Sequence, residues 1–148
     1  MGKIGIDANI FLCVLLPEST RADEENIKGS ERVLRSLTKN NGITSSIVLA
    51  ETAWAFLREE KDGIELEAAR HVIETMNGLE ILKVDDNIAW DAGKLRRKHY
   101  SKELQLSYQD AIYLATCINE KVEAFYTTDS HLLKMSEETI KVIEAKDF

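Results

Sequence analysis

Short, apolar, β-prone segments alternate with longer segments of helical period along almost the whole chain. The predicted strands are residues 3–6, 43–45, 79–84, 124–128 and 140–143. Between them, apolar residues recur at the spacing of amphipathic helices, and pairs such as Asn77-Gly78 end the helical segments. This alternation indicates an α/β domain with a mainly parallel sheet, because neighbouring parallel strands need a crossover connection between them.

The predicted helices differ in their apolar content. Residues 8–16 are apolar up to Pro17, and residues 107–119 form a second strongly apolar helix. A helix over residues 46–61, with Ser46 at its N-cap, would carry an apolar stripe made of Ile47, Ala50, Trp54 and Leu57. We therefore expect the helices over 46–61 and 107–119 to be largely buried.

Length and composition indicate one domain over residues 1–148. The 148 residues include one proline and seven scattered glycines, so no linker divides the chain. Cys13 and Cys117 lie in apolar runs and are expected in the core, rather than in a disulfide or a thiolate metal site. No apolar run is long enough to span a bilayer and no signal peptide is evident, so a cytoplasmic location is expected.

The formal net charge of −7 limits how the chain could bind nucleic acid. Binding through a broad basic face depends on Lys and Arg replacing condensed counterions, which such a chain is poorly suited to do. A metal-dependent nuclease is still compatible with this charge, because a bound cation would neutralise its acidic site. The charge therefore argues more strongly against a passive nucleic-acid binder than against an enzyme.

Four carboxylates occupy positions that a parallel sheet would bring together. Asp7 follows the first predicted strand and Asp129 follows the strand over 124–128, so both are expected at the carboxyl edge of the sheet. That edge is where open α/β sheets bind ligands. Glu51 and Asp110 lie in the first turns of helices that begin with a serine.

Each of these acids also has a structural explanation when it is taken alone. Asp110 completes a capping-box pattern with Ser107, Asp7 and Asp129 could each cap a following helix, and Glu51 could be an ordinary charge at a helix edge. Together, however, partly buried carboxylates repel one another and favour a divalent cation as counter-charge. Oxygen ligands without a Cys or His motif suit Mg²⁺ or Mn²⁺ better than Zn²⁺. Such an ion can activate water for phosphodiester hydrolysis.

Four motifs, in order along the chain, resemble one family. They are IGIDANIFL, ITSSIVLAETAW, LSYQDAIYLATC and FYTTDSHLL. They resemble the PIN-domain ribonucleases, especially the VapC-like toxin component of prokaryotic toxin–antitoxin pairs. The resemblance implies a five-stranded parallel sheet in the order 3-2-1-4-5, flanked by helices. It also implies an endoribonuclease that depends on Mg²⁺ or Mn²⁺, forms a homodimer and is held inactive by an antitoxin protein.

The same resemblance assigns roles to individual residues. It makes metal ligands and catalytic residues of Asp7, Glu51, Asp110 and Asp129. It marks three polar neighbours that would orient the carboxylates or a water on the metal, namely Asn9, Ser46 and Thr128. Their structural alternatives are a turn residue, an N-cap and a strand-end hydroxyl. Some relatives carry a further acid where this chain has His131, so one metal ion is expected rather than two.

The densest basic stretch of the chain is residues 94–99. Arg96, Arg97 and Lys98 are candidates for contacts with RNA phosphates, and the alternative is a solvated helix end favoured by the helix dipole. Aromatic residues make up only 7% of the chain and do not interleave with basic residues along it, so no base-stacking surface is predicted.

Three other functions remain compatible with the sequence. One is a catalytically silent PIN-like module that binds RNA or protein, and another is an orphan RNA-processing nuclease without an antitoxin. The third is a phosphatase that uses Asp7 as nucleophile. It would need a second carboxylate at position 9, where this chain has Asn9.

Overall fold

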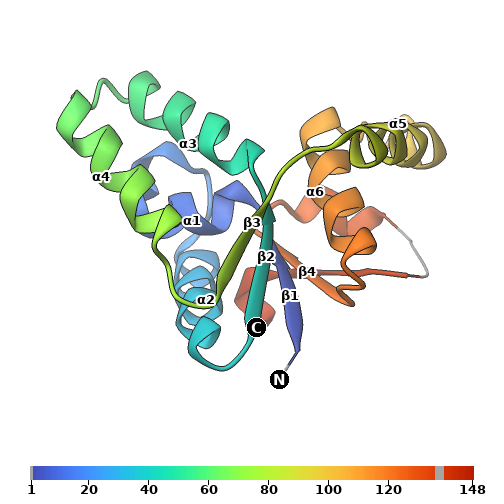
Figure 1. The fold of residues 1–148 in the computed structure, drawn as a ribbon, viewed down its shortest axis with the longest axis horizontal. Coiled ribbons are helices and arrows are strands. Elements are labelled where there is room, and N and C mark those ends of the chain that lie inside the picture. The colour runs from blue at the N-terminus through green and yellow to red at the C-terminus, as the bar shows by residue number, and fades with distance from the viewer. Residues whose placement is uncertain (1, 136–138) are drawn as a thin grey trace.

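A five-stranded parallel sheet lies at the centre of the molecule (Figure 1). The computed structural model describes residues 2–135 and 139–148. The strands are β1 Lys3–Ile6, β2 Asn41–Ser45, β3 Leu79–Leu82, β4 Ala124–Thr127 and β5 Lys141–Glu144. Their order is β3-β2-β1-β4-β5, and each neighbouring pair is parallel. The predicted α/β class and strand order are therefore confirmed.

Helices cover both faces of this sheet. Within residues 2–135 and 139–148 the α-helices are α1 Ala8–Leu15, α2 Glu24–Arg35, α3 Ile47–Arg58, α4 Gly63–Glu74, α5 Asp86–His99 and α6 Tyr108–Asn119. Figure 1 shows α1 to α4 on one side of the sheet, and α5 and α6 on the other. The change of side follows from the strand order, because the chain crosses from the β3 edge back to β4. None of the helices in this described part is long and apolar enough to span a membrane.

Side-chain caps determine where several helices begin. Asp23, Asp85 and Ser107 each accept a hydrogen bond from the backbone N–H three residues further on, at 2.9, 2.8 and 3.1 Å. Asp62 and Glu65 form a reciprocal capping box at the start of α4. These local bonds satisfy backbone donors that the helix itself cannot pair, so the sequence alone places these helix starts well.

The predicted orientation of α3 is wrong. Trp54 and Leu57, placed on its buried stripe, are 67% and 56% exposed. The buried side of α3 instead carries Ala55 and Phe56, which pack in one cluster with Leu12 of α1 and other residues of α1 and α4. Because α3 has apolar residues on almost every side, periodicity could not identify the side that α1 and α4 cover.

Ser46 is the N-cap residue of α3, as predicted, but the expected capping bond does not form. Ser46 precedes the helix but makes no side-chain capping bond. The preceding residue supplies a weaker one, since Ser45 Oγ accepts from the backbone N–H of Ile47 at 3.3 Å. Ser46 is therefore not held by a capping bond.

Gly5 in β1 lets α6 lie directly against the sheet. A Cβ added at Gly5 would lie 2.5 Å from Cys117 Sγ and 2.8 Å from Phe125 Cδ2. Cys13 and Cys117 are both buried and unbridged, as predicted. Because α6 runs antiparallel to the strands, this close packing brings its first turn to the carboxyl edge of the sheet, where Asp7 lies.

Candidate functional site

Asp7 lies at the junction of β1 and α1 and is only 3% exposed. Its Oδ1 accepts from the backbone N–H of Ile10 at 3.3 Å, which caps α1, and its Oδ2 accepts from Thr127 Oγ1 at 2.7 Å. Burial raises the pKa of Asp7 to about 7, against the lowering effect of these two hydrogen bonds. The negative charges of Asp110 and Glu51 contribute to the same rise. Both acids therefore lie within electrostatic range of Asp7.

Thr127, at the end of β4, connects two of the predicted acids. Its hydroxyl donates to Asp7 and accepts from the backbone N–H of Asp129 at 3.0 Å. The sequence interpretation chose the neighbouring Thr128 and missed Thr127. In β4 the buried positions alternate, with Phe125 and Thr127 facing the interior. A period-two pattern extended to the end of the strand would have selected Thr127.

Glu51 and Tyr113 each bring a polar side-chain atom into the interior of the protein. Within the part of the chain that the structure describes, neither Glu51 Oε1 nor Tyr113 Oη, both buried, has a partner in hydrogen-bonding geometry. Burial raises the pKa of Glu51. The Tyr113 hydroxyl lies near the Glu51 carboxylate and lowers this pKa. Asp110 adds a repulsive charge that raises it again. The pair leaves a carboxylate oxygen free for a further ligand.

Asp110 and Asp129 complete the acidic cluster. Burial raises the pKa of Asp110, the Ser107 side chain lowers it, and the charge of Asp129 raises it further. His131 lies close enough to lower the pKa of Asp110. Asp129 Oδ1 accepts from the backbone N–H of His131 at 2.9 Å, so Asp129 caps the short 3₁₀-helix Ser130–Lys134. The capping roles of Asp7 and Asp129 are thus real, and they coexist with the clustering.

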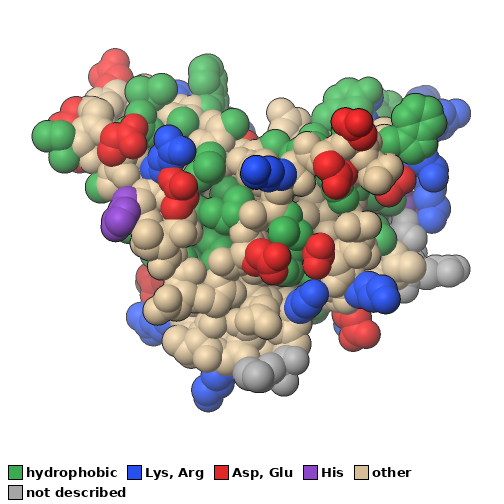
Figure 2. Space-filling model, viewed as in Figure 1, with side chains coloured by type: hydrophobic (Ala, Val, Ile, Leu, Met, Phe, Trp, Pro, Cys, Tyr) green, Lys and Arg blue, Asp and Glu red, His purple; other side chains and the backbone are tan. Residues whose placement is uncertain are grey.

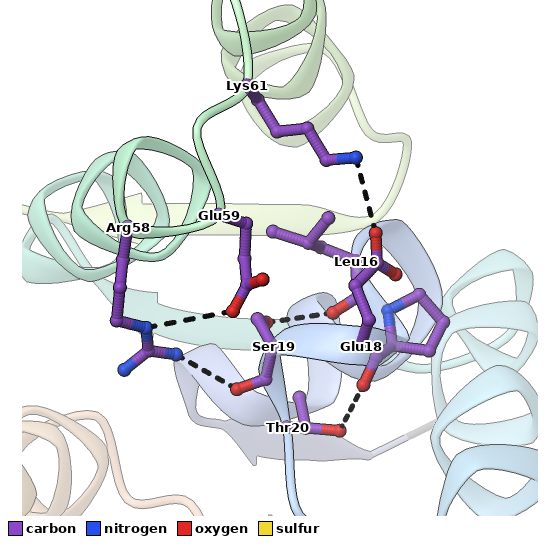
Figure 3. A network of polar contacts seen from close by, with 8 residues as sticks. Leu16, Glu18, Ser19, Thr20, Arg58, Glu59 and Lys61 are labelled. Atoms are coloured by element: carbon purple, nitrogen blue, oxygen red, sulfur yellow. Dashed lines mark hydrogen bonds and ion pairs between the residues drawn. The ribbon is translucent and has the colours of Figure 1, made fainter.

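A cleft of about 960 Å³ opens beside these acids. Its lining includes Asn9, Glu51, Trp54, Arg58, Thr128 and Asp129. Arg58 also fixes one wall, since its Nη2 donates to the carbonyl oxygen of Ser19 at 3.0 Å (Figure 3). The adjacent ion pair between Lys61 and Glu18, 3.4 Å apart, ties the same loop to the segment after α3. Ser46, in contrast, is not among the residues that line this cleft.

The family model for the PIN domain matches residues 4–138. The chain belongs to the PIN-domain family. No curated protein is similar enough in sequence to match it.

Several solved structures from toxin–antitoxin systems share this PIN fold. VapBC2 from Rickettsia felis, solved with a DNA fragment from its promoter, matches with a TM-score of 0.70 and 17% identity over 96% of this chain and 98% of that chain. VapC20 from Mycobacterium tuberculosis, a toxin that cleaves the sarcin-ricin loop, gives 0.66 and 20% over 86% and 90%. DNA-bound VapBC from Salmonella typhimurium gives 0.59 and 22% over 98% and 99%. At these identities the likeness concerns the fold.

The donor set of this PIN domain suits a hard metal ion that keeps part of its water shell. Over residues 2–135 and 139–148, no three His, Cys, Asp or Glu side chains lie close enough to hold one ion together. The nearby donors are carboxylate oxygens, and Glu51 Oε1 is buried and unpartnered. Mg²⁺ commonly keeps several waters and uses only one or two carboxylates. The residues therefore fit a partly hydrated hard cation, and the four-ligand set stays a prediction.

The predicted basic residues lie away from this cleft. Arg96, Arg97 and Lys98 belong to the last turn of α5 and do not line it. If these residues bind RNA, they contact a part of the strand outside the cleft, on the α5–α6 side of the PIN domain.

Proposed function

We propose that this protein is a divalent-metal-dependent endoribonuclease, and the toxin of a toxin–antitoxin pair. The observation that carries this proposal is the buried carboxylate of Asp7 at the carboxyl edge of the sheet, with Asp110 and Glu51 as its charged neighbours. Such a cluster is costly without a cation. Membership of the PIN-domain family supports the same chemistry.

Of the four predicted ligands Asp7, Glu51, Asp110 and Asp129, one or two would bind the ion, Mg²⁺ or Mn²⁺, directly, and the others would bind it through its waters. A bound cation would supply a Lewis acid for the phosphodiester and lower the pKa of water. Thr127 fixes the orientation of Asp7 through its 2.7 Å hydrogen bond. Tyr113 faces Glu51 from the interior. Asn9 and Thr128 line the cleft and would contact substrate or solvent, and Ser46, the N-cap residue of α3, would orient a carboxylate or a water on the ion.

A protein partner is part of the same proposal. The solved relatives from Rickettsia felis and Salmonella typhimurium are VapBC toxin–antitoxin structures. Trp54, which lines the cleft, is 67% exposed, and Leu57 of α3 and Ile64 of α4 are 56% and 82% exposed. Figure 2 shows hydrophobic side chains protruding over the α3–α4 side of the molecule. Such exposed apolar groups support an antitoxin or a second copy of the chain as partner. Antitoxin and RNA would both meet the protein in the cytoplasm.

The proposed activity predicts that cleavage of single-stranded RNA needs Mg²⁺ or Mn²⁺ and stops in EDTA. Asp110→Asn should lower the cleavage rate at least about 100-fold, because it removes a charge that binds the ion but keeps the backbone N–H that bonds to Ser107. Asp86→Asn, an exposed acid in the first turn of α5, is the matched control and should cleave normally. The measurement is the rate of RNA cleavage on denaturing gels. Cleavage that continues in EDTA, or in the Asp110 variant at the wild-type rate, contradicts the proposal.

Tyr113→Phe should weaken Mn²⁺ binding by about 10- to 100-fold, the usual cost of losing a group that orients a metal ligand. The ring contact with Phe125, with centroids 6.4 Å apart, is kept, so the fold should be at least as stable as before. Isothermal titration with Mn²⁺ measures the affinity, and thermal unfolding in EDTA checks the fold. Tyr126→Phe is the control, since Tyr126 packs against Phe148 instead. Equal Mn²⁺ affinity in wild type and Tyr113→Phe would show that the hydroxyl does not position Glu51.

A further inference from the structure

An arginine lies between two exposed tyrosines where α5 ends and α6 begins. The guanidinium carbon of Arg96 is 5.2 Å from the ring centroid of Tyr100 and 4.3 Å from that of Tyr108. Arg96 Nε also donates to the carbonyl oxygen of Leu106 at 3.0 Å, which fixes the stack to the loop between the helices. The sequence predicts no base-stacking surface, because aromatic and basic residues do not interleave along the chain, yet the structure places Arg96 against two tyrosines. The fold joins residues that are separated along the chain.

The stack forms one side of a pocket of about 370 Å³. Gly93, Arg96, Arg97, Tyr100 and Tyr108 line it. Its size falls within the range of about 300–1,000 Å³ that is usual for small ligands. Tyr100 and Tyr108 are 46% and 57% exposed, so part of each ring is open to solvent. Arg97 is exposed at the edge of the pocket.

The pocket lies close to the acidic cluster. Tyr108 is the first residue of α6, and Asp110 belongs to the same first turn. Residues two apart on a helix do not face the same side, so an RNA strand with its scissile phosphate at Asp110 would pass over the start of α6 to bring a nearby nucleotide to Tyr108. Ring faces and guanidinium planes are the surfaces on which proteins stack unpaired bases.

We propose that this pocket binds one base of single-stranded RNA on the exposed side of the stack that Tyr100, Arg96 and Tyr108 form, with Arg97 at the adjoining phosphate. The proposal rests on the proposed function, since it names a subsite for the RNA of the same acidic site. Stacking also explains how an acidic protein could bind RNA. A chain of net charge −7 has little general attraction for a polyanion, and a stacked base contributes affinity without a broad basic face.

The first test compares Tyr108→Ala with Tyr108→Phe in EDTA, where no metal-dependent cleavage interferes. Fluorescence anisotropy measures binding of a labelled single-stranded RNA and of an abasic strand of the same length. We expect Tyr108→Ala to weaken binding of the RNA about tenfold and to leave the abasic strand unchanged, whereas Tyr108→Phe binds both like wild type. Equal affinity of the wild type for the two strands would overturn the proposal.

The second test fills the pocket without touching the stack. Nothing lies within 4 Å of a Cβ added at Gly93, so Gly93→Leu should fold normally, and it replaces a helix-weakening glycine. It should weaken RNA binding about as much as Tyr108→Ala. Gly93→Ala is the control for loss of the glycine, and Ala89→Leu adds the same bulk at an exposed position one turn earlier on α5. Both controls should bind RNA normally.

These measurements separate the pocket from the nuclease. If Gly93→Leu bound RNA with the affinity of the wild type, the proposed role of the pocket would be overturned, even if the protein cleaves RNA. Base-dependent binding that Gly93→Leu abolishes would support the pocket, even if no cleavage were detected. An acidic peptide that binds at the pocket and displaces no RNA would identify a protein-binding surface and overturn the proposal.

Discussion

Asp7→Asn is expected to lower metal-dependent RNA cleavage at least about 1,000-fold while the protein stays folded. The carboxylate charge that would attract the ion is lost, and each factor of ten corresponds to about 1.4 kcal/mol of transition-state stabilisation. Asn is as good an N-cap as Asp, so the bond from the backbone N–H of Ile10 can remain. The hydroxyl of Thr127 loses only its acceptor at Oδ2.

A matched variant distinguishes the charge from the capping role. Asp23 caps α2 as Asp7 caps α1, by accepting from the backbone N–H three residues on, but it is exposed. Asp23→Asn should therefore cleave RNA at the wild-type rate. The rates are measured with Mg²⁺ and with Mn²⁺, and circular dichroism confirms the fold of each variant. Wild-type cleavage by a highly purified Asp7→Asn protein would rule out the proposed site.

The same preparations test the alternative of a silent binding module. Such a module need not bind Mn²⁺ at a defined site. A wild-type protein that neither cleaves RNA nor binds Mn²⁺ in isothermal titration would favour that function. Stoichiometric Mn²⁺ binding that Asp7→Asn abolishes would favour the nuclease.

Local chemistry made much of this structure predictable. Asp7 directly after an apolar strand, and Ser107 before a run of helical period, mark two element boundaries that the structure keeps. Their hydrogen bonds form within one turn, so no distant residue is needed to place them. The strand order came from the family resemblance, since periodicity by itself does not determine which strands pair.

Contacts between distant residues were not predictable in this way. Period two marks Thr127 as a buried strand residue, but its 2.7 Å bond to Asp7 exists only because β1 and β4 are neighbours. The sequence around Tyr113 predicts an ordinary buried helix residue, and only the packing of α3 brings Glu51 close to it. Tyr100 and Tyr108 flank Arg96 only after the chain turns between α5 and α6. Single-sequence patterns contain no information on such pairings.

The second large effect concerns stability. Burial raises the pKa of Asp7 from an ordinary value of 3.8 to about 7 in the folded protein. Between these values the folded state holds a proton that the unfolded state has released. The contribution of Asp7 to stability is therefore fully present below about pH 4 and is lost as the pH rises through 7. A shift of about three pH units corresponds to at most about 4 kcal/mol.

In EDTA at pH 8, Asp7→Asn should therefore be more stable than the wild type, by up to about 4 kcal/mol, and the difference should shrink at pH 5. Asn carries no charge to bury, whereas the wild type must keep a carboxylate ionised beside Asp110 and Glu51. Mn²⁺ at 100 times its dissociation constant should raise the free energy of unfolding of the wild type by about 2.7 kcal/mol and that of the variant only slightly. Urea unfolding at the two pH values, with and without Mn²⁺, measures all three differences. If wild type and variant showed the same pH dependence, Asp7 would not be held as a costly charge that a cation relieves.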